Sequence, residues 1–310
     1  MSDMYLKEAL IRQLVANGAP IVTEYEIFRN LRNLHFSEMY DGKKIRVSKS
    51  DPDRARYRNI VSKLERDRYL RPDPDIYPPL EEAFLSHYGG PAPIAVFRVS
   101  DVPDGTAEDI TALLDPFCYI SHMSAMQRYS LTNRIPEALS LSTPRNWALH
   151  RNEKIARDYG DVKPGTYIAP LKQIGWPDTI RKRQISLHKT VRSPVVKQVR
   201  GSFARITAVG EVFVQMLDRP ELCGGMRHVI EVWDQKAEIY FEDIIKAVDS
   251  AEEAIIKVRA GYLLEERLNL SHPDISGWSS FAQRGGSRKL DPSAEYVPTF
   301  SEKWMLSLNV

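Results

Sequence analysis

The sequence predicts an α+β fold in two domains. Its 310 residues exceed the usual size of one domain, which is about 100 to 200 residues. Apolar residues recur at helical spacing up to about residue 67, whereas strand-like and helix-like runs alternate beyond residue 94. Between them, His87-Tyr88-Gly89-Gly90-Pro91-Ala92-Pro93 interrupts any periodic element. We therefore expect one domain over residues 1–88 and a second over residues 94–310.

Composition excludes several classes of protein. Lys and Arg total 43 against 41 Asp and Glu, so the net charge of +2 does not indicate a general polyanion binder. The two cysteines, Cys118 and Cys223, form no CxxC motif, which argues against a zinc ribbon or a disulfide framework. The first ten residues lack the apolar run of a signal peptide, and no window approaches about 18 uninterrupted apolar residues. We expect a cytoplasmic protein.

The first two predicted helices follow from apolar spacing. Tyr5, Leu6, Ala9, Leu10 and Leu14 share one face of a helix that Gly18 and Pro20 end. Thr23 and Glu26 have the spacing of a capping box, which predicts the start of a second helix. That helix turns Ile27, Phe28, Leu31 and Leu34 inward.

The third predicted helix and the two strands after it complete the order of elements in the first domain. Asp51-Pro52 reads as an N-cap with a first-turn proline and opens a helix to about Asp67. Short strands at 69–71 and 76–77 then flank the turn-rich residues 72–75. Three helices followed by a hairpin are typical of a winged helix-turn-helix.

The third helix carries the clearest functional pattern. Residues 43–71 hold eleven basic and four acidic side chains. Tyr57, Ile60, Val61 and Leu64 form the side predicted to be buried. The other sides could read guanine and adenine through Arg and Asn and contact phosphates through the flanking cations. An ordinary solvated helix face is the alternative. The predicted DNA-binding residues, two of which lie in the hairpin, are Arg54, Arg56, Arg58, Asn59, Ser62, Lys63, Arg66, Arg68 and Arg71.

The predicted second domain mixes strands and helices. Strands at 94–99 and 117–120 flank a short helix at 107–114, and Ser121 is expected to cap a helix that ends at Tyr129. Residues 184–191 alternate like a half-buried strand, which 195–199 could pair. Helices are expected from 209, at 226–237, at 240–248, and from a Ser250–Glu253 capping box to about 266. The apolar run 304–308 is expected to dock back.

Several stretches of the second part are similar to the AbiEi-type antitoxins of type IV toxin-antitoxin and abortive-infection modules. They are Tyr119-Ile120-Ser121-His122-Met123-Ser124-Ala125-Met126 continuing to Leu131-Thr132, Pro220-Glu221-Leu222-Cys223-Gly224-Gly225, Arg259-Ala260-Gly261-Tyr262-Leu263-Leu264-Glu265, and Arg284-Gly285-Gly286-Ser287-Arg288-Lys289-Leu290-Asp291-Pro292 with Trp304. The family's N-terminal winged helix-turn-helix agrees with the order of elements above. The chain departs from the family at Ala208-Val209-Gly210-Glu211, where many members have Ser-Pro-Glu-Arg.

The resemblance implies a bacterial phage-defence protein located at the nucleoid in the cytoplasm. It would bind duplex DNA at its own promoter, at inverted repeats, and repress its operon. Its C-terminal domain, residues 94–310, would be an AbiEi-like antitoxin domain that counteracts a nucleotidyltransferase-like toxin without a stable complex. We expect no catalysis, cofactor, metal or membrane partner.

A second basic stretch, residues 172–205, has nine Lys or Arg side chains against Asp178 alone. Two interpretations of this stretch remain: an ordinary solvated face, or a surface that binds a polyanion or the toxin. The residues predicted for that surface are Arg181, Lys182, Arg183, Lys189 and Arg192.

Other reactive residue types have plainer explanations. Ser121, His122 and Ser124 are expected to cap and pack a helix, because no acid is placed to orient the histidine. Glu231, Asp234 and Lys236 are expected on a solvated helix face, and Gly224-Gly225 at positive φ in a turn. Two alternatives remain: a nuclease or phosphotransferase delivered to DNA by a winged helix, and a ligand-sensing regulator with a concave apolar pocket.

Overall fold

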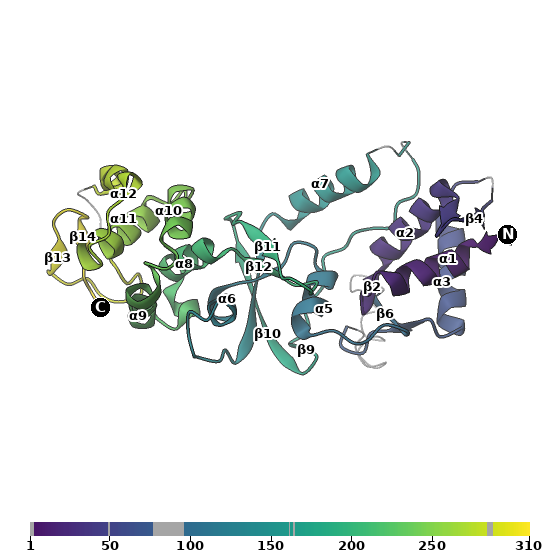
Figure 1. The fold of residues 1–310 in the computed structure, drawn as a ribbon, viewed down its shortest axis with the longest axis horizontal. Coiled ribbons are helices and arrows are strands. Elements are labelled where there is room, and N and C mark those ends of the chain that lie inside the picture. Colours follow the sequence, from purple (N-terminus) through teal and green to yellow (C-terminus); the bar gives the residue numbers. More distant parts are fainter. Residues whose placement is uncertain (1–2, 49, 77–95, 161, 164, 284–287) are drawn as a thin grey trace, which may run out of the picture. The chain divides into compact units, whose positions relative to one another are not determined.

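A computed structural model shows a mixed α+β protein made of two compact units (Figure 1). It describes residues 3–48, 50–76, 96–160, 162–163, 165–283 and 288–310. Unit 1 comprises Met1–Cys118, Thr143–Ile185 and Val199–Ala204, and unit 2 comprises Tyr119–Ser142, Ser186–Gln198 and Arg205–Val310. These units do not follow the expected boundaries of residues 1–88 and 94–310, and the expected linker lies outside the described residues. In the described part of the chain, no helix combines the length and apolar character that a membrane crossing requires.

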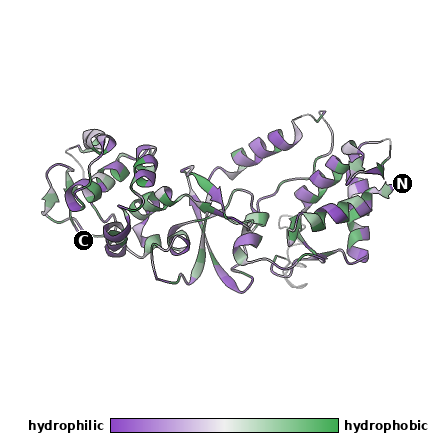
Figure 2. Ribbon diagram, in the orientation of Figure 1, coloured by the Kyte–Doolittle hydropathy of each residue, from purple (hydrophilic) through white to green (hydrophobic). Residues whose placement is uncertain are grey.

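The three N-terminal helices are present in unit 1 as α1 (Leu6–Ala16), α2 (Glu24–Ser37) and α3 (Arg54–Arg66). The predicted apolar residues of these helices are buried in one core, except that Tyr5 lies in the strand β1 (Met4–Tyr5) and is 63% exposed, and Ile60 is only partly buried. Figure 2 shows polar and apolar colours on these helices. The Thr23 hydroxyl accepts from the Glu26 amide at 3.4 Å as expected, but the Glu26 carboxylate pairs with Arg29 instead of completing the box. The third helix begins after Asp53, two residues later than predicted, because Asp53 caps the Arg56 amide at 2.7 Å.

A three-stranded sheet contributes residues to the same core as these helices. Its strands are β2 (Ile21–Thr23), β5 (Leu70–Pro72) and β6 (Val96–Val99), in the order β2-β6-β5. β5 pairs antiparallel with β6, so the hairpin predicted between 69–71 and 76–77 is wrong: Ile76 lies in a turn and Tyr77 is outside the described residues. β6 was expected to open the second domain, yet it lies between two strands of unit 1.

A hairpin between α2 and α3 was not predicted. β3 (Met39–Tyr40) pairs with β4 (Lys43–Arg46), and β4 also pairs with β1 (Met4–Tyr5). Asp41 and Gly42 have φ of 49° and 71°, as the two central residues of a type I′ turn require. Asp-Gly between short runs is the sequence signal for such a hairpin.

Two later segments complete the core of unit 1. α7 (Trp147–Tyr159) brings the Tyr159 ring edge-on to Tyr25, with 5.7 Å between centroids, and Tyr167 meets Phe28 in the same way at 5.1 Å. The Tyr25 hydroxyl donates to Asp158 at 2.9 Å. α5 (Ala107–Leu114) starts at a complete capping box formed by Thr106 and Asp109. The core of the N-terminal helices therefore also contains residues from segments that follow residue 94.

A six-stranded sheet has the order β11-β12-β7-β8-β10-β9. β11 pairs with β12 rather than with the strand at 184–191, so that predicted pairing is wrong. The short helix α6 (His122–Arg128) follows β7. The strands are β7 (Tyr119–Ile120), β8 (Ala138–Pro144), β9 (Thr179–Ile180), β10 (Arg183–Thr190), β11 (Val196–Gln198) and β12 (Arg205–Thr207).

Unit 2 continues as a helical bundle. Its elements are α8 (Val209–Asp218), η1 (Pro220–Cys223), α9 (Met226–Lys236), α10 (Phe241–Asp249), α11 (Ala254–Gly261), the π-helical η2 (Tyr262–Arg267), α12 (Pro273–Trp278), η3 (Ser279–Phe281), β13 (Phe300–Ser301) and β14 (Leu306–Ser307). The capping box predicted at Ser250 is wrong, since α11 begins at Ala254 and the Ser250 hydroxyl bonds Ala247.

Two glycines set close contacts in this bundle. A Cβ on Gly210 would lie 2.0 Å from the Asp243 carbonyl oxygen, so α8 and α10 approach each other more closely there than a side chain would permit. A Cβ on Gly261 would lie 2.1 Å from the ring of Trp304, which is fully buried. The C-terminal run therefore docks as predicted.

Candidate nucleic-acid interface

The outward side of α3 carries six of the predicted residues. Arg54, Arg58, Asn59, Ser62, Lys63 and Arg66 are all exposed. Tyr57, Val61 and Leu64 on the opposite side are buried in the core of unit 1. Within the described part of the chain, none of the six side chains forms an ion pair or a hydrogen bond. Their polar groups are therefore free to meet an external partner.

Arg56 differs from its neighbours on α3. Its side chain is half-buried and donates to the Ser48 hydroxyl and to the Ser50 carbonyl oxygen, the latter at 3.4 Å. This arginine ties the loop before α3 to the helix. Its predicted role as a DNA contact thus competes with a structural one.

The C-terminal end of α3 holds a strained basic residue. The Tyr69 amide donates to the Leu64 carbonyl at 2.9 Å, as in a Schellman motif, and Arg68 occupies the left-handed position at φ 62° where glycine is usual. The Ser100 hydroxyl donates to the Arg68 carbonyl at 2.5 Å. The side chains of Arg68 and Arg71 are exposed. A glycine would relieve the backbone at residue 68 but would remove a cation.

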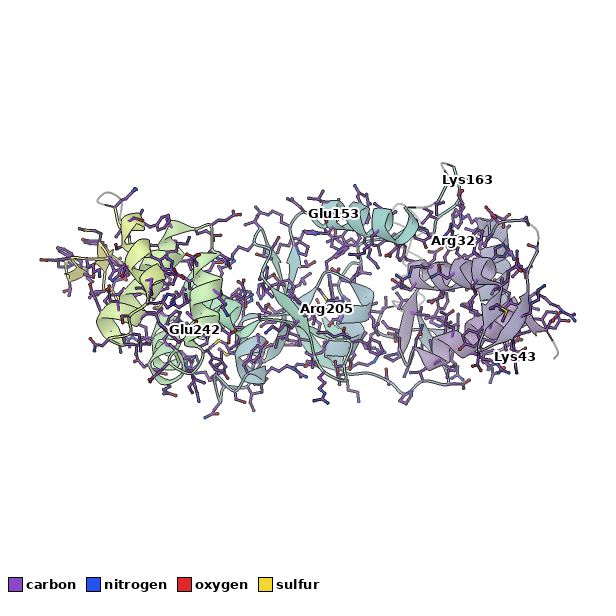
Figure 3. All side chains as sticks on the ribbon, turned by 45° about the horizontal axis from the view of Figure 1, so that its top comes forward. Arg32, Lys43, Glu153, Lys163, Arg205 and Glu242 are labelled. Atoms are coloured by element: carbon purple, nitrogen blue, oxygen red, sulfur yellow. The ribbon has the colours of Figure 1, made fainter. Side chains whose placement is uncertain are left out.

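The β3–β4 hairpin adds basic residues that the sequence analysis missed. Lys43 and Lys44 follow its Asp41-Gly42 turn and are exposed. Lys43 is labelled in Figure 3. Arg46 instead pairs with Asp3 at 3.2 Å. The Asp-Gly dipeptide was the available signal for placing these lysines on a rigid strand rather than in a loop.

A cavity of about 590 Å³ lies between α1 and the Lys63 side of α3. Lys7 and Lys63 both line it, and Lys7 pairs there with Asp67. Lys63 is therefore on the flank of the helix, as expected for a residue that contacts phosphates rather than bases.

The second basic stretch is partly neutralised. The Arg181 guanidinium, 14% exposed, contacts Asp73 at 2.7 Å, Asp75 at 2.5 Å and Asp104 at 3.0 Å. Arg183 pairs with Glu108 at 2.8 Å. The acids are distant in sequence, so a count of local charge could not include them.

In unit 2, Arg192 pairs with Glu253 at 3.0 Å and with Glu211 at 3.6 Å. Of the five residues predicted for this surface, Lys182 and Lys189 remain exposed without an ion pair in the described structure. The five residues therefore do not form one surface of unpaired positive charge, because Arg181, Arg183 and Arg192 are paired with acids.

Ser121, His122 and Ser124 lie in a buried polar cluster of unit 2. Ser121 does not cap α6: its hydroxyl lies 2.9 Å from His122 Nδ1 and accepts from the Ser142 hydroxyl at 2.8 Å. Burial, with His188 and Arg219 nearby, lowers the pKa of His122 to about 3. The capping prediction failed because β8 supplies a hydrogen-bond partner that local sequence cannot reveal, whereas the expected packing role agrees with this burial.

Other candidate groups separate in the structure. Asp234 forms a two-pronged ion pair with Arg267 at 2.7 and 2.8 Å, whereas Glu231 and Lys236 line a pocket to which Asp234 does not contribute. Gly224 and Gly225 have φ of 90° and 87°, which confirms the predicted turn. Among the residues that the structure describes, no group of three or more His, Cys, Asp or Glu side chains could hold a metal ion.

Comparison with known proteins gives a distant structural similarity. No family model matches the chain, and no curated protein is significantly similar to it. The chain is similar to the solved crystal structure of the RV2827C protein from Mycobacterium tuberculosis, with 11% sequence identity and a TM-score of 0.44. The alignment covers 97% of this chain and 90% of that chain. At this TM-score the similarity does not establish a shared fold.

Proposed function

We propose that unit 1 binds duplex DNA through α3 and that the protein is a transcriptional autorepressor and antitoxin of a type IV module. The observation that carries the DNA-binding proposal is the exposed side of α3, whose four cations lack acidic partners in the described structure. Elsewhere in unit 1, buried and half-buried arginines such as Arg181 and Arg183 are paired with acids. Unpaired cations on one helix face favour a polyanion.

The arrangement around α3 supports a winged helix as the form of this domain. After β1, the order is α1, β2, α2, the β3–β4 hairpin, α3 and β5, and β6 pairs with both β5 and the earlier strand β2. In this arrangement α3 enters the major groove, where Arg58 and Arg66 suit guanine and Asn59 suits adenine. Lys63 and Arg68 flank the helix and contact phosphates.

Arg68→Gly separates binding from folding. A residue with a side chain pays about 1 to 2 kcal/mol of steric strain in the left-handed conformation, and glycine avoids this strain. Glycine also loses more backbone entropy on folding, which offsets about 0.5 to 1 kcal/mol of that gain. The variant should therefore unfold at a slightly higher temperature, while its affinity for DNA falls and the salt dependence of log K loses about one unit of slope. A more stable protein with unchanged DNA affinity would remove Arg68 from the interface.

Base reading is tested with promoter and random duplexes in fluorescence anisotropy titrations. Asn59→Ala should reduce the discrimination between them by about 1 to 3 kcal/mol, whereas Lys63→Ala should weaken binding to both equally. Arg12→Ala is the matched control, because Arg12 is an exposed α1 residue paired with Glu8 at 2.7 Å. If Arg12→Ala weakens binding as much as Lys63→Ala does, the effect is one of net charge and α3 is not the interface.

The antitoxin part of the proposal rests on the sequence resemblance and has its own test. Co-expression of the full chain with its cognate nucleotidyltransferase-like toxin should restore the growth of cells that the toxin arrests. The Asn59→Ala and Arg68→Gly variants should lose repression and keep this rescue. Growth arrest that the wild-type chain does not relieve would contradict the antitoxin assignment while leaving DNA binding in place.

A further inference from the structure

A polar pocket of about 390 Å³ lies in unit 2, between α9 and the loop that follows α6. The loop contributes consecutive residues from Ser130 to Arg134, and α9 contributes side chains from successive turns of one face. Its volume falls within the range of pockets that hold small molecules. Two sequence stretches quoted above for their resemblance border it: Leu131-Thr132 lines it, and Gly224 lies behind it.

A buried hydrogen bond fixes the two walls of the pocket. Thr132 Oγ1 lies 2.9 Å from His228 Nε2, and both residues are 8% exposed. The Arg134 amide donates to the same threonine oxygen at 3.1 Å. The loop is thereby held on α9, so the pocket is formed without a ligand.

Gly224 places the guanidinium of Arg134. Its carbonyl accepts from Arg134 Nη1 at 3.3 Å. A Cβ at Gly224 would lie 2.9 Å from the His228 ring and 3.1 Å from that nitrogen, so only glycine fits there without displacement. Arg134 is held by one contact and keeps its remaining donors for a ligand.

The charges of the pocket are unbalanced. Arg134 and Lys236 line it and have no acidic partner among the described residues. Glu231 is the one carboxylate of the lining, and it lies 3.4 Å from His228 Nδ1. Ser130, Asn133 and Gln235 add neutral hydrogen-bonding groups suited to hydroxyls. These side chains suit a ligand that carries an anionic group next to hydroxyl groups.

We propose that this pocket binds a phosphorylated sugar, either free or as part of a nucleotide, with Arg134 and Lys236 on the phosphate. The hydroxyls meet the amides of Asn133 and Gln235. The inference is independent of the proposed DNA binding, because it concerns unit 2 alone and requires no nucleic acid.

Isothermal titration calorimetry on the full chain tests the pocket with ribose 5-phosphate, AMP, ribose and adenosine as probes. We expect saturable binding of at least one phosphorylated probe, and binding of its unphosphorylated counterpart weakened by about tenfold or more. A preference between AMP and ribose 5-phosphate identifies the source of the phosphate. Arg134→Ala and Lys236→Ala should each weaken binding by about tenfold or more.

Arg227→Ala is the matched control, since Arg227 is an exposed arginine of α9 outside the pocket lining. Its affinity should equal that of the wild type. The proposal is overturned if no phosphorylated probe binds, if adenosine or ribose binds as tightly as its phosphate, or if the control variant loses as much affinity as Arg134→Ala. Thermal unfolding of each variant verifies that Arg134→Ala, a change at an exposed side chain, leaves the protein folded.

Discussion

Replacing Arg181 by alanine should destabilise unit 1 far more than a typical surface arginine would. The side chain is 14% exposed, and its partner Asp73 is fully buried. Burial lowers the pKa of Arg181, but the hydrogen bonds that its guanidinium donates to Asp73 and Asp75 outweigh it and hold the pKa above its ordinary value. Alanine would leave the Asp73 carboxylate buried without its cation.

The expected loss follows from that geometry. Removing one partner of a buried ion pair costs about 3 to 5 kcal/mol. For a unit of this size, such a loss lowers the melting temperature by about 6 to 20 °C. Arg183→Ala is the control, because Arg183 and Glu108 are 34% and 19% exposed and a pair of this kind contributes about 1 kcal/mol or less.

Differential scanning calorimetry and urea unfolding give the comparison. Adding Asp73→Asn to Arg181→Ala should recover part of the loss, since the unpaired charge is then gone. If Arg181→Ala melts within about 2 °C of the Arg183→Ala control, the three aspartates contribute no net stability through this arginine.

Three further predictions concern folding. His122 is buried with a pKa of about 3, so its contribution to stability is complete above pH 6.5 and decreases as the pH falls toward 3. In urea unfolding, His122→Asn, which tolerates positive φ, should reduce the loss of stability between pH 7.5 and 5.5 by about 1 kcal/mol. Part of the loss should remain, because burial also lowers the pKa of His35 and His188. Gly261→Ala should lower the free energy of unfolding by about 1 to 3 kcal/mol and shift the tryptophan fluorescence, because the new Cβ displaces Trp304. Gly277→Ala is the control, since nothing lies within 4 Å of its Cβ; in thermal unfolding it should be neutral or stabilising by about 0.4 to 1 kcal/mol. Lys182 has φ 62° in the turn between β9 and β10, so Lys182→Gly should raise the free energy of unfolding by about 0.5 kcal/mol, and a lower value would contradict the turn geometry.

Local sequence predicted what local interactions determine. The helices α1 to α3 were predicted because their apolar residues repeat every three to four positions. Gly18, Thr23 and Asp51-Pro52 marked helix ends, although the cap of α3 is Asp53. The exposed side of α3 followed from the same periodicity. The mixed α+β class followed from the alternation of patterns.

Long-range partners could not be predicted in this way. Arg181 was assigned to a charged surface because its acids lie 77 to 108 positions away in sequence. The pocket in unit 2 depends on Thr132 and His228, which are 96 positions apart. β6 looked like the start of a new domain because a strand's apolar pattern indicates burial but not the strand beside it.

The three-part composition of each unit has a consequence for how this chain could change in evolution. A single crossover between genes exchanges everything on one side of a point, and no point along this chain has all of unit 1 on one side and all of unit 2 on the other. An exchange at the segment 87–93 would separate α1, α2 and α3 from α7 and from Tyr167, leaving Tyr25 and Phe28 uncovered. We therefore expect the two units to be inherited together. Under the proposed function, a new DNA specificity would arise by substitution on α3 rather than by exchange of an N-terminal domain.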